Sequence, residues 1–184
     1  MADVPRNIDV TANLVDGKVK FSMSGNGVGG EQIQFNKDNT PNMKKNEHYI
    51  VTFTLIDNTG LELRYVQWPN NSPEDGAMWV KVVTDPSDPT CPAPNSHLQQ
   101  FKAKDVKDTV LTVKNKDDDI EYLKFALNFI PKNGNDSNPA QYVQYDPIGD
   151  NRNGGIVKSN VAVVIAVVVI VVAAAAATKF LGLW

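Results

Sequence analysis

The sequence predicts a mainly β protein: an antiparallel β-sandwich, immunoglobulin-like in architecture, followed by one C-terminal hydrophobic α-helix. Two observations predict the sandwich. Apolar and polar residues alternate along several short segments, and turn-forming Gly, Asn, Asp and Pro residues separate these segments. A third observation predicts the helix, because an uncharged apolar run extends from Val161 to Ala177. We therefore expect a β-sandwich domain (1–150), a flexible linker rich in Gly and Asn (151–160), and a hydrophobic helix with a short tail (161–184).

The alternation is clearest in two segments. Apolar residues occupy the odd positions from 49 to 55, with threonines on the opposite face. Leu and Phe alternate from 123 to 129, with Lys124 and Asn128 on the opposite face. The stretches "VDGK" and "IDNTG" are signals for hairpin turns between such segments. The predicted strands are Ile8–Val15, Lys18–Ser24, Glu31–Phe35, Tyr49–Asp57, Leu61–Trp68, Met78–Thr84, Thr109–Lys114, Ile120–Ile130 and Gln141–Tyr145.

The apolar run from Val161 to Ala177 has the length of a membrane span. As a helix, its roughly 17 residues extend about 26 Å, close to the hydrocarbon thickness of about 30 Å. A lone strand in lipid would leave its backbone unsatisfied, so we expect a helix. Flanking residues suited to the membrane interface are Lys158, Lys179, Phe180 and Trp184. The residues expected to contact lipid or other copies of the chain are Val161, Val164, Ile165, Val168, Val172, Ala173, Ala174, Ala175, Ala176 and Ala177.

The combination of a polar β domain and an apolar helix predicts a non-enzymatic structural or interaction protein. In the first interpretation, the helix anchors the sandwich in membrane lipid and associates with copies of itself to form a homo-oligomer. In the second, the helix is the core of a cell-associated or extracellular filament or tube, since an all-round apolar helix must be buried. A third possibility is a tethered ligand-binding sandwich. The first residues, "MADVPRNIDV", do not resemble a secretory signal peptide, so we expect the β domain on the cytoplasmic side.

Composition argues against several classes of partner and cofactor. The net charge is −3 and the acids and bases are interspersed, so no basic face for nucleic acid is expected. The single cysteine, Cys91, excludes an intrachain disulfide. We find no G-x-S-x-G or H-E-x-x-H motif and no nucleophile–base set, and no small-molecule substrate is indicated.

A glycine-rich stretch, "SGNGVGG", places Gly25, Gly27 and Gly30 in a G-x-G-x-x-G pattern. A dinucleotide site requires this motif to open a helix, whose N-terminus binds the pyrophosphate. Here the following residues, "EQIQF", alternate like a strand. A glycine-rich hairpin loop is therefore the favoured interpretation.

Two patterns suggest metal sites, but both lack required ligands, and no metal cofactor is expected. Cys91, His97 and His48 suggest a copper site, but no axial Met follows His97, and the cysteine lies in a proline-rich loop. In "NKDDDIE", oxygen ligands alternate from Asn115 to Asp119 through Asp117, like the start of a calcium loop. The pattern requires Gly at the next position, where the chain has Ile, and lacks the distal Glu, so a solvated hairpin turn is favoured.

The stretches "HYIVTFTLID", "LTVKNKDDDIEYLKFALNF" and "QYDPIGDNRNGG" resemble the small bacterial proteins of the DP-EP family, over residues 48–155. The similarity is greatest at "YDPIGDN", which contains Asp146 and Pro147. The family has no assigned activity, so the resemblance implies a bacterial β-rich module. Physically, Pro147 has a fixed φ and no N–H to donate, and we expect it to end the last strand and release the chain from the sandwich.

Overall fold

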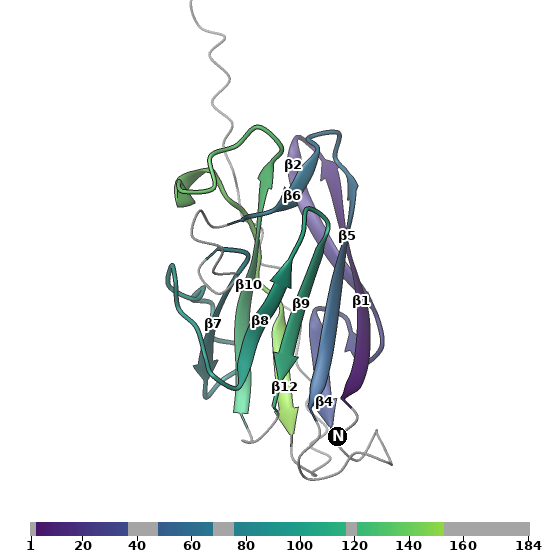
Figure 1. Cartoon of the computed structure of the whole chain (residues 1–184), viewed down its shortest axis with the longest axis vertical. Coiled ribbons are helices and arrows are strands. Elements are labelled where there is room, and N and C mark those ends of the chain that lie inside the picture. Colours follow the sequence, from purple (N-terminus) through teal and green to yellow (C-terminus); the bar gives the residue numbers. More distant parts are fainter. Residues whose placement is uncertain (1–2, 37–47, 68–75, 117–120, 153–184) are drawn as a thin grey trace, which may run out of the picture.

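The computed structural model describes residues 3–36, 48–67, 76–116 and 121–152, which form two β-sheets (Figure 1). The first sheet has the strand order β2-β1-β5-β9-β8. Its strands are β1 (Val4–Val15), β2 (Lys18–Gly25), β5 (Tyr49–Asn58), β8 (Phe101–Val106) and β9 (Val110–Asn115). β5 lies in the middle of this sheet, and its alternating residues bury one face in the core.

The second sheet is built around the long strand β10 (Glu121–Pro131). Its order is β11-β10-β12-β4-β3, and β6 and β7 also pair with β10. The other strands are β3 (Val28–Gly29), β4 (Gln32–Asn36), β6 (Leu63–Tyr65), β7 (Met78–Val83), β11 (Val143–Tyr145) and β12 (Ile148–Arg152). A short 3-10 helix, Pro139–Gln141, precedes β11.

All nine predicted strand segments contain an observed strand, but the prediction of purely antiparallel sheets is wrong. β1 runs parallel to β5, with Val4 opposite Tyr49, and β12 runs parallel to β4, with Ile148 opposite Gln32. Both parallel pairs join strands that are far apart in sequence, as parallel pairing requires long connections. The "IDNTG" turn is also not a hairpin, because β5 and β6 belong to different sheets. The sheets are therefore mixed.

The expectation that Pro147 ends the sheet is also wrong. The chain resumes pairing one residue later, in β12, which lies between β10 and β4. The hydrogen bonding continues around the proline, since the carbonyl of Pro147 accepts from Phe125 N at 3.3 Å and Ile148 N donates to Glu31 O at 3.0 Å. The proline thus separates β11 from β12 without removing the chain from the sheet. Of the predicted linker, residues 151 and 152 belong to β12, and the remainder lies outside the described residues.

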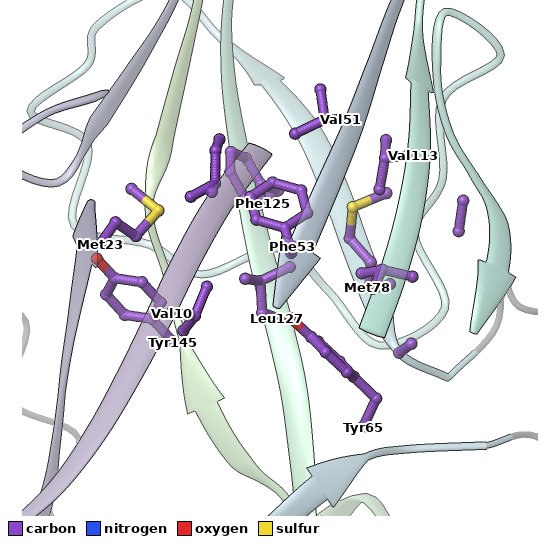
Figure 2. Packing of buried hydrophobic residues seen from close by; sticks show 14 of the residues in the cluster. Val10, Met23, Val51, Phe53, Tyr65, Met78, Val113, Phe125, Leu127 and Tyr145 are labelled. Carbon is purple, nitrogen blue, oxygen red and sulfur yellow. The ribbon is translucent and has the colours of Figure 1, made fainter. Parts of the chain in front are cut away.

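One cluster of buried apolar side chains contains residues of both sheets. The rings of Phe53 in β5 and Phe125 in β10 have centroids 5.8 Å apart, and Figure 2 shows them side by side in the core. Phe35 of β4 and Tyr49 of β5 make a similar contact at 5.4 Å. All four side chains are fully buried. The two sheets therefore share a single core.

In two turns, the backbone conformation explains which residue types are found there. The β1–β2 hairpin turns at Asp16 and Gly17, which both have positive φ (52° and 72°), as a two-residue turn of this kind demands. At Gly25, φ is 135°, and an added Cβ would lie 2.3 Å from the carbonyl oxygen of Asn7. The glycine-rich stretch is followed by a strand rather than a helix, but it is a hairpin only where β3 pairs with β4, because β2 belongs to the other sheet.

The face of β10 that points away from the main core is also covered. A second apolar cluster lies there, composed of Val66, Trp79, Ala126, Ile130 and Tyr142. Beside it, the fully buried Asn128 donates from Nδ2 to Gly76 O at 2.7 Å and accepts from Gln144 Nε2 at 2.9 Å. A bidentate ion pair between Arg64 and Asp136, with both N–O distances 2.8 Å, ties the segment after β10 to β6. This face is therefore a second packed layer rather than a solvated surface.

Candidate functional site

Two lysines lie opposite one another on this covered face. Lys81 of β7 pairs in register with Lys124 of β10. Lys124 has only 6% of its surface exposed, which is unusual for a lysine. Like charges directly opposite one another on neighbouring strands destabilise a sheet, so this pair requires a compensating group.

The compensating group comes from the segment between β7 and β8, residues 84–100, which we call the covering segment. The carboxylate of Asp88 lies 3.0 Å from Lys81 Nζ through Oδ2. Lys124 Nζ donates to the main-chain carbonyl of Asp88, and Lys81 Nζ also donates to Thr90 Oγ1. One residue of the covering segment therefore satisfies both ammonium groups. The segment also lies along the free edge of β7, where Val80 N donates to Ser96 O at 3.0 Å.

The local sequence explains this turn. "DPSDPT" repeats an Asp-Pro-hydroxyl pattern in which each aspartate bonds forward to the residue two positions later. Asp85 Oδ1 accepts from Ser87 N at 2.8 Å and from Ser87 Oγ at 2.7 Å. Asp88 Oδ1 accepts from Thr90 N and Oγ1 at the same two distances. Two successive turns of this kind place the main-chain carbonyl and the Oδ2 atom of Asp88 over the lysines.

The covering segment is joined a second time to the sheet at the break between β11 and β12. Cys91 Sγ donates a hydrogen bond to Asp146 Oδ2. The second carboxyl oxygen of Asp146, Oδ1, is buried and has no hydrogen-bond partner within the described part of the chain. Pro92 and Pro147, which follow the two bonded residues, are both buried. The thiol–carboxyl contact thus joins two proline-containing stretches that are remote in sequence.

The electrostatics of this cluster differ between its two aspartates. The hydrogen bonds from Thr90, and then the contact with Lys81, lower the pKa of Asp88 far below its usual value. Burial raises the pKa of Asp146, against the smaller opposing effects of the Cys91 hydrogen bond and the charges of Lys124 and Lys81. Burial and the contact with Asp146 raise the pKa of Cys91 to about 11. Asp88 is therefore ionised, while the thiol stays protonated at neutral pH.

This arrangement limits the chemistry that the cluster can perform. A protonated thiol is a poor nucleophile and a poor metal ligand. In the described ranges, no three His, Cys, Asp or Glu side chains come together in a way that could hold a metal ion. Both lysines are engaged by Asp88. The cluster is suited to hold the covering segment on the sheet, and it leaves one uncommitted group, Oδ1 of Asp146.

The residues predicted from sequence are placed as follows. His97 is exposed, with Nδ1 3.3 Å from Asn95 O, and His48 lies directly before β5. Asn115 ends β9 and is fully buried, whereas 117 and 119 lie outside the described residues. The predicted membrane and oligomerisation residues in 161–177, and the interface residues 158, 179, 180 and 184, also lie outside them.

Within the four described ranges, no helix combines the length and the hydropathy of a membrane span.

The sequence interpretation did not identify this cluster. The lysines meet only through strand pairing, and the sequence gives no indication of what Asp146 contacts. Two signals are present in the sequence: Lys124 lies within a mostly apolar strand, and Asp-Pro occurs at 85–86, 88–89 and 146–147. Neither a protein-family model nor a curated protein sequence matches this chain. The interpretation of the cluster therefore depends on its geometry.

Proposed function

We propose that this chain is a non-enzymatic structural or interaction protein, in which a two-sheet β-sandwich is held at a membrane by the apolar run Val161–Ala177. The observation that carries this proposal is the run itself, which contains no charged or strongly polar residue. About ten of its residues are Val or Ile, which contribute on the order of −3 to −6 kcal/mol to insertion as a helix. This free energy is sufficient to hold a small domain at a bilayer.

The β module supports the same proposal because residues of both sheets share one buried core. The core cluster contains residues from both sheets, and its largest aromatic side chains are fully buried. We propose that the sheets pack face to face as an immunoglobulin-like sandwich, with contacts such as Phe53–Phe125 and Phe21–Phe129 between them. The apolar run is then free to be buried elsewhere, in lipid or against other copies of itself.

The non-enzymatic character is proposed from the polar cluster. Its charged groups neutralise one another, its thiol is protonated, and its hydrogen bonds join a loop to a sheet. These are properties of a structural contact. They give no pair of groups suited to exchange a proton with a substrate near neutral pH.

The test compares the full chain with a fragment that ends at Arg152, the last residue of β12. After cell lysis, we expect the full chain in the membrane pellet and the fragment in the supernatant. Far-UV circular dichroism of the fragment should show strand and almost no helix, with cooperative unfolding. A fragment that pellets with membranes, or that is unfolded, would contradict the proposal.

A further inference from the structure

The chain contains three Asp-Pro peptide bonds, after Asp85, Asp88 and Asp146. Such bonds are chemically special because the side-chain carboxylate can attack its own main-chain carbonyl carbon and close a small ring. A group held next to its target reacts with a high effective concentration. Proline supplies the leaving group, since its nitrogen belongs to a tertiary amide and departs as a secondary amine once protonated. Reaction at a given bond requires a carboxyl oxygen that is free to attack.

The carboxyl oxygens of the other two aspartates are hydrogen-bonded within the chain or open to water. Oδ1 of Asp85 accepts two hydrogen bonds from Ser87, and this aspartate is exposed, so its other carboxyl oxygen is open to water. Oδ1 of Asp88 accepts two from Thr90, and its Oδ2 is paired with Lys81. An oxygen bound in this way must first lose its partners before it can act as a nucleophile.

Asp146 differs from both. Its Oδ1 atom is buried without a hydrogen-bond partner among the described residues, while its Oδ2 atom accepts from Cys91. The thiol therefore fixes one side of the carboxyl group and leaves the other oxygen uncommitted. The cationic groups that act on this carboxyl are the ammonium groups of Lys124 and Lys81, from β10 and β7. Their positive charge favours the anionic intermediate that forms when a carboxylate attacks a carbonyl carbon.

We propose that Asp146–Pro147 is a self-cleaving bond, which the chain hydrolyses under mildly acidic conditions. In the first step, Oδ1 of the ionised carboxyl forms a bond to the main-chain carbonyl carbon of Asp146, and the bond from that carbon to Pro147 N breaks. The proline nitrogen takes up a proton and becomes a new N-terminus, leaving a cyclic anhydride at Asp146. One water molecule then opens the anhydride and restores two carboxyl groups. The net change is the addition of one water, with no oxidation or reduction.

The environment of Asp146 shifts the pH of fastest cleavage toward less acidic values. The leaving nitrogen needs a proton, whereas the attacking carboxyl must be ionised, so the rate is greatest near the carboxyl pKa. Burial raises that pKa, against the Cys91 hydrogen bond and the two lysines. A carboxylate of higher pKa is also the more basic nucleophile.

Cleavage after Asp146 would divide the chain into two fragments. The bond lies between β11 and β12, so the products are 1–146 and 147–184. The second product contains β12 and the apolar run. β12 is held by β10 and β4, so the two products separate when this short strand leaves the sheet. This consequence rests on the proposed function: acid cleavage would release the β module from the membrane.

The experiment incubates the full chain in detergent at about pH 5 and pH 7, folded and in urea, and measures intact masses over time. All three Asp-Pro bonds are followed in the same sample. In the folded chain at the lower pH, we expect cleavage after Asp146 to be at least about tenfold faster than after Asp85 or Asp88. It should also be about tenfold faster than at the same bond in urea. Equal rates at the three bonds, or no acceleration by folding, would overturn the proposal.

A variant provides a second test. Asp146→Glu keeps the charge but enlarges the ring, and we expect it to reduce cleavage at this bond by at least about tenfold. Undiminished cleavage in a folded Asp146→Glu chain would overturn the proposal. If the Asp146→Glu variant does not fold, the comparison of cleavage rates at the three Asp-Pro bonds of the natural chain still tests the proposal. The masses are measured in detergent, so the cleavage result does not depend on whether the chain binds a membrane. If no cleavage is found, the membrane-anchoring proposal still stands.

Discussion

The thiol of Cys91 donates a hydrogen bond to the carboxyl group of Asp146, 55 residues further along the chain. This contact fastens the covering segment to the point where Pro147 separates β11 from β12. Lys124 and Lys81 complete the cluster through Asp88. Because the Cys91–Asp146 and Lys124–Asp88 contacts join segments remote in sequence, the cluster holds the layer over β7 and β10 in place.

Asp146 should make the stability of the β module depend on pH. Its pKa is raised by burial above the ordinary value of 3.8, so the folded chain binds this proton more tightly than the unfolded chain. Its contribution to stability is therefore fully present below that ordinary value and is lost as the pH rises through the folded pKa. Asp146→Asn cannot ionise, so its stability relative to the natural fragment should increase as the pH rises above the ordinary carboxyl value. Urea unfolding of the 1–152 fragment measures this, and identical pH profiles would contradict it.

Comparing substitutions of Asp88 and Asp85 separates the contribution of the lysine contacts to stability from that of the turns. Both accept two hydrogen bonds from the residue two positions later, but Asp88 also pairs with Lys81 and places its carbonyl on Lys124. We expect Asp88→Ala to lower the urea midpoint of the fragment clearly more than Asp85→Ala, because it removes the carboxylate that pairs with Lys81, which lies opposite Lys124. Equal effects of the two substitutions would show that only the turns matter.

The ion pair between Arg64 and Asp136 should contribute more than a surface pair. Both partners are mostly buried, with 16% and 22% of their side chains exposed, and Gln67 N also donates to Asp136 at 2.7 Å. We expect Asp136→Asn to cost about 1–2 kcal/mol at neutral pH. The control is Glu62→Gln in the exposed Glu62–Lys132 pair, which should change stability by less than about 0.5 kcal/mol.

The effect of Asp136→Asn on stability should depend on pH in the opposite sense to that of Asp146→Asn. Burial alone would raise the pKa of Asp136, but the hydrogen bonds from Arg64 and Gln67 outweigh it and lower the pKa. The stabilisation is thus present above the ordinary value of 3.8 and is lost as the pH falls through the folded pKa. The difference between the natural fragment and Asp136→Asn should therefore narrow in acid. A difference that is constant with pH would exclude an ionised Asp136 as its source.

The strands could be located from sequence because their apolar residues recur with period two. Three strands could not: β3 is only two residues long, β8 has few apolar residues and a register shift after Ala103, and β12 was hidden by Pro147. The parallel pairing of β1 with β5 depends on which strands meet after folding, which periodicity does not encode. The polar cluster was inaccessible for the same reason, since Lys81, Lys124 and Asp146 are brought together only by the pairing of β7, β10 and β12.

Self-association of the apolar run is tested by adding bulk at its small residues without making the run less apolar. If helices pack against one another, small residues lie where the backbones approach closely, and bulk there causes overpacking of typically about 1–3 kcal/mol. Single Leu substitutions at each position from Ala173 to Ala177 should therefore weaken the oligomer at one or two positions, as followed by cross-linking or mass photometry. Val168→Leu serves as the control for added hydrophobicity. Five variants that behave like the natural chain would indicate a plain anchor.

The most direct test of the membrane proposal is vesicle flotation of two matched double variants of the full chain. Val168→Asp with Ile170→Asp adds roughly 5–7 kcal/mol to the cost of insertion and removes two favourable residues, which together cancel most or all of what the apolar run supplies. Val168→Leu with Ile170→Leu leaves insertion favourable. We predict that the natural chain and the Leu variant float with lipid vesicles and resist extraction at alkaline pH, whereas the Asp variant stays at the bottom of the gradient. A natural chain that does not float, or an Asp variant that floats equally well, would contradict the account.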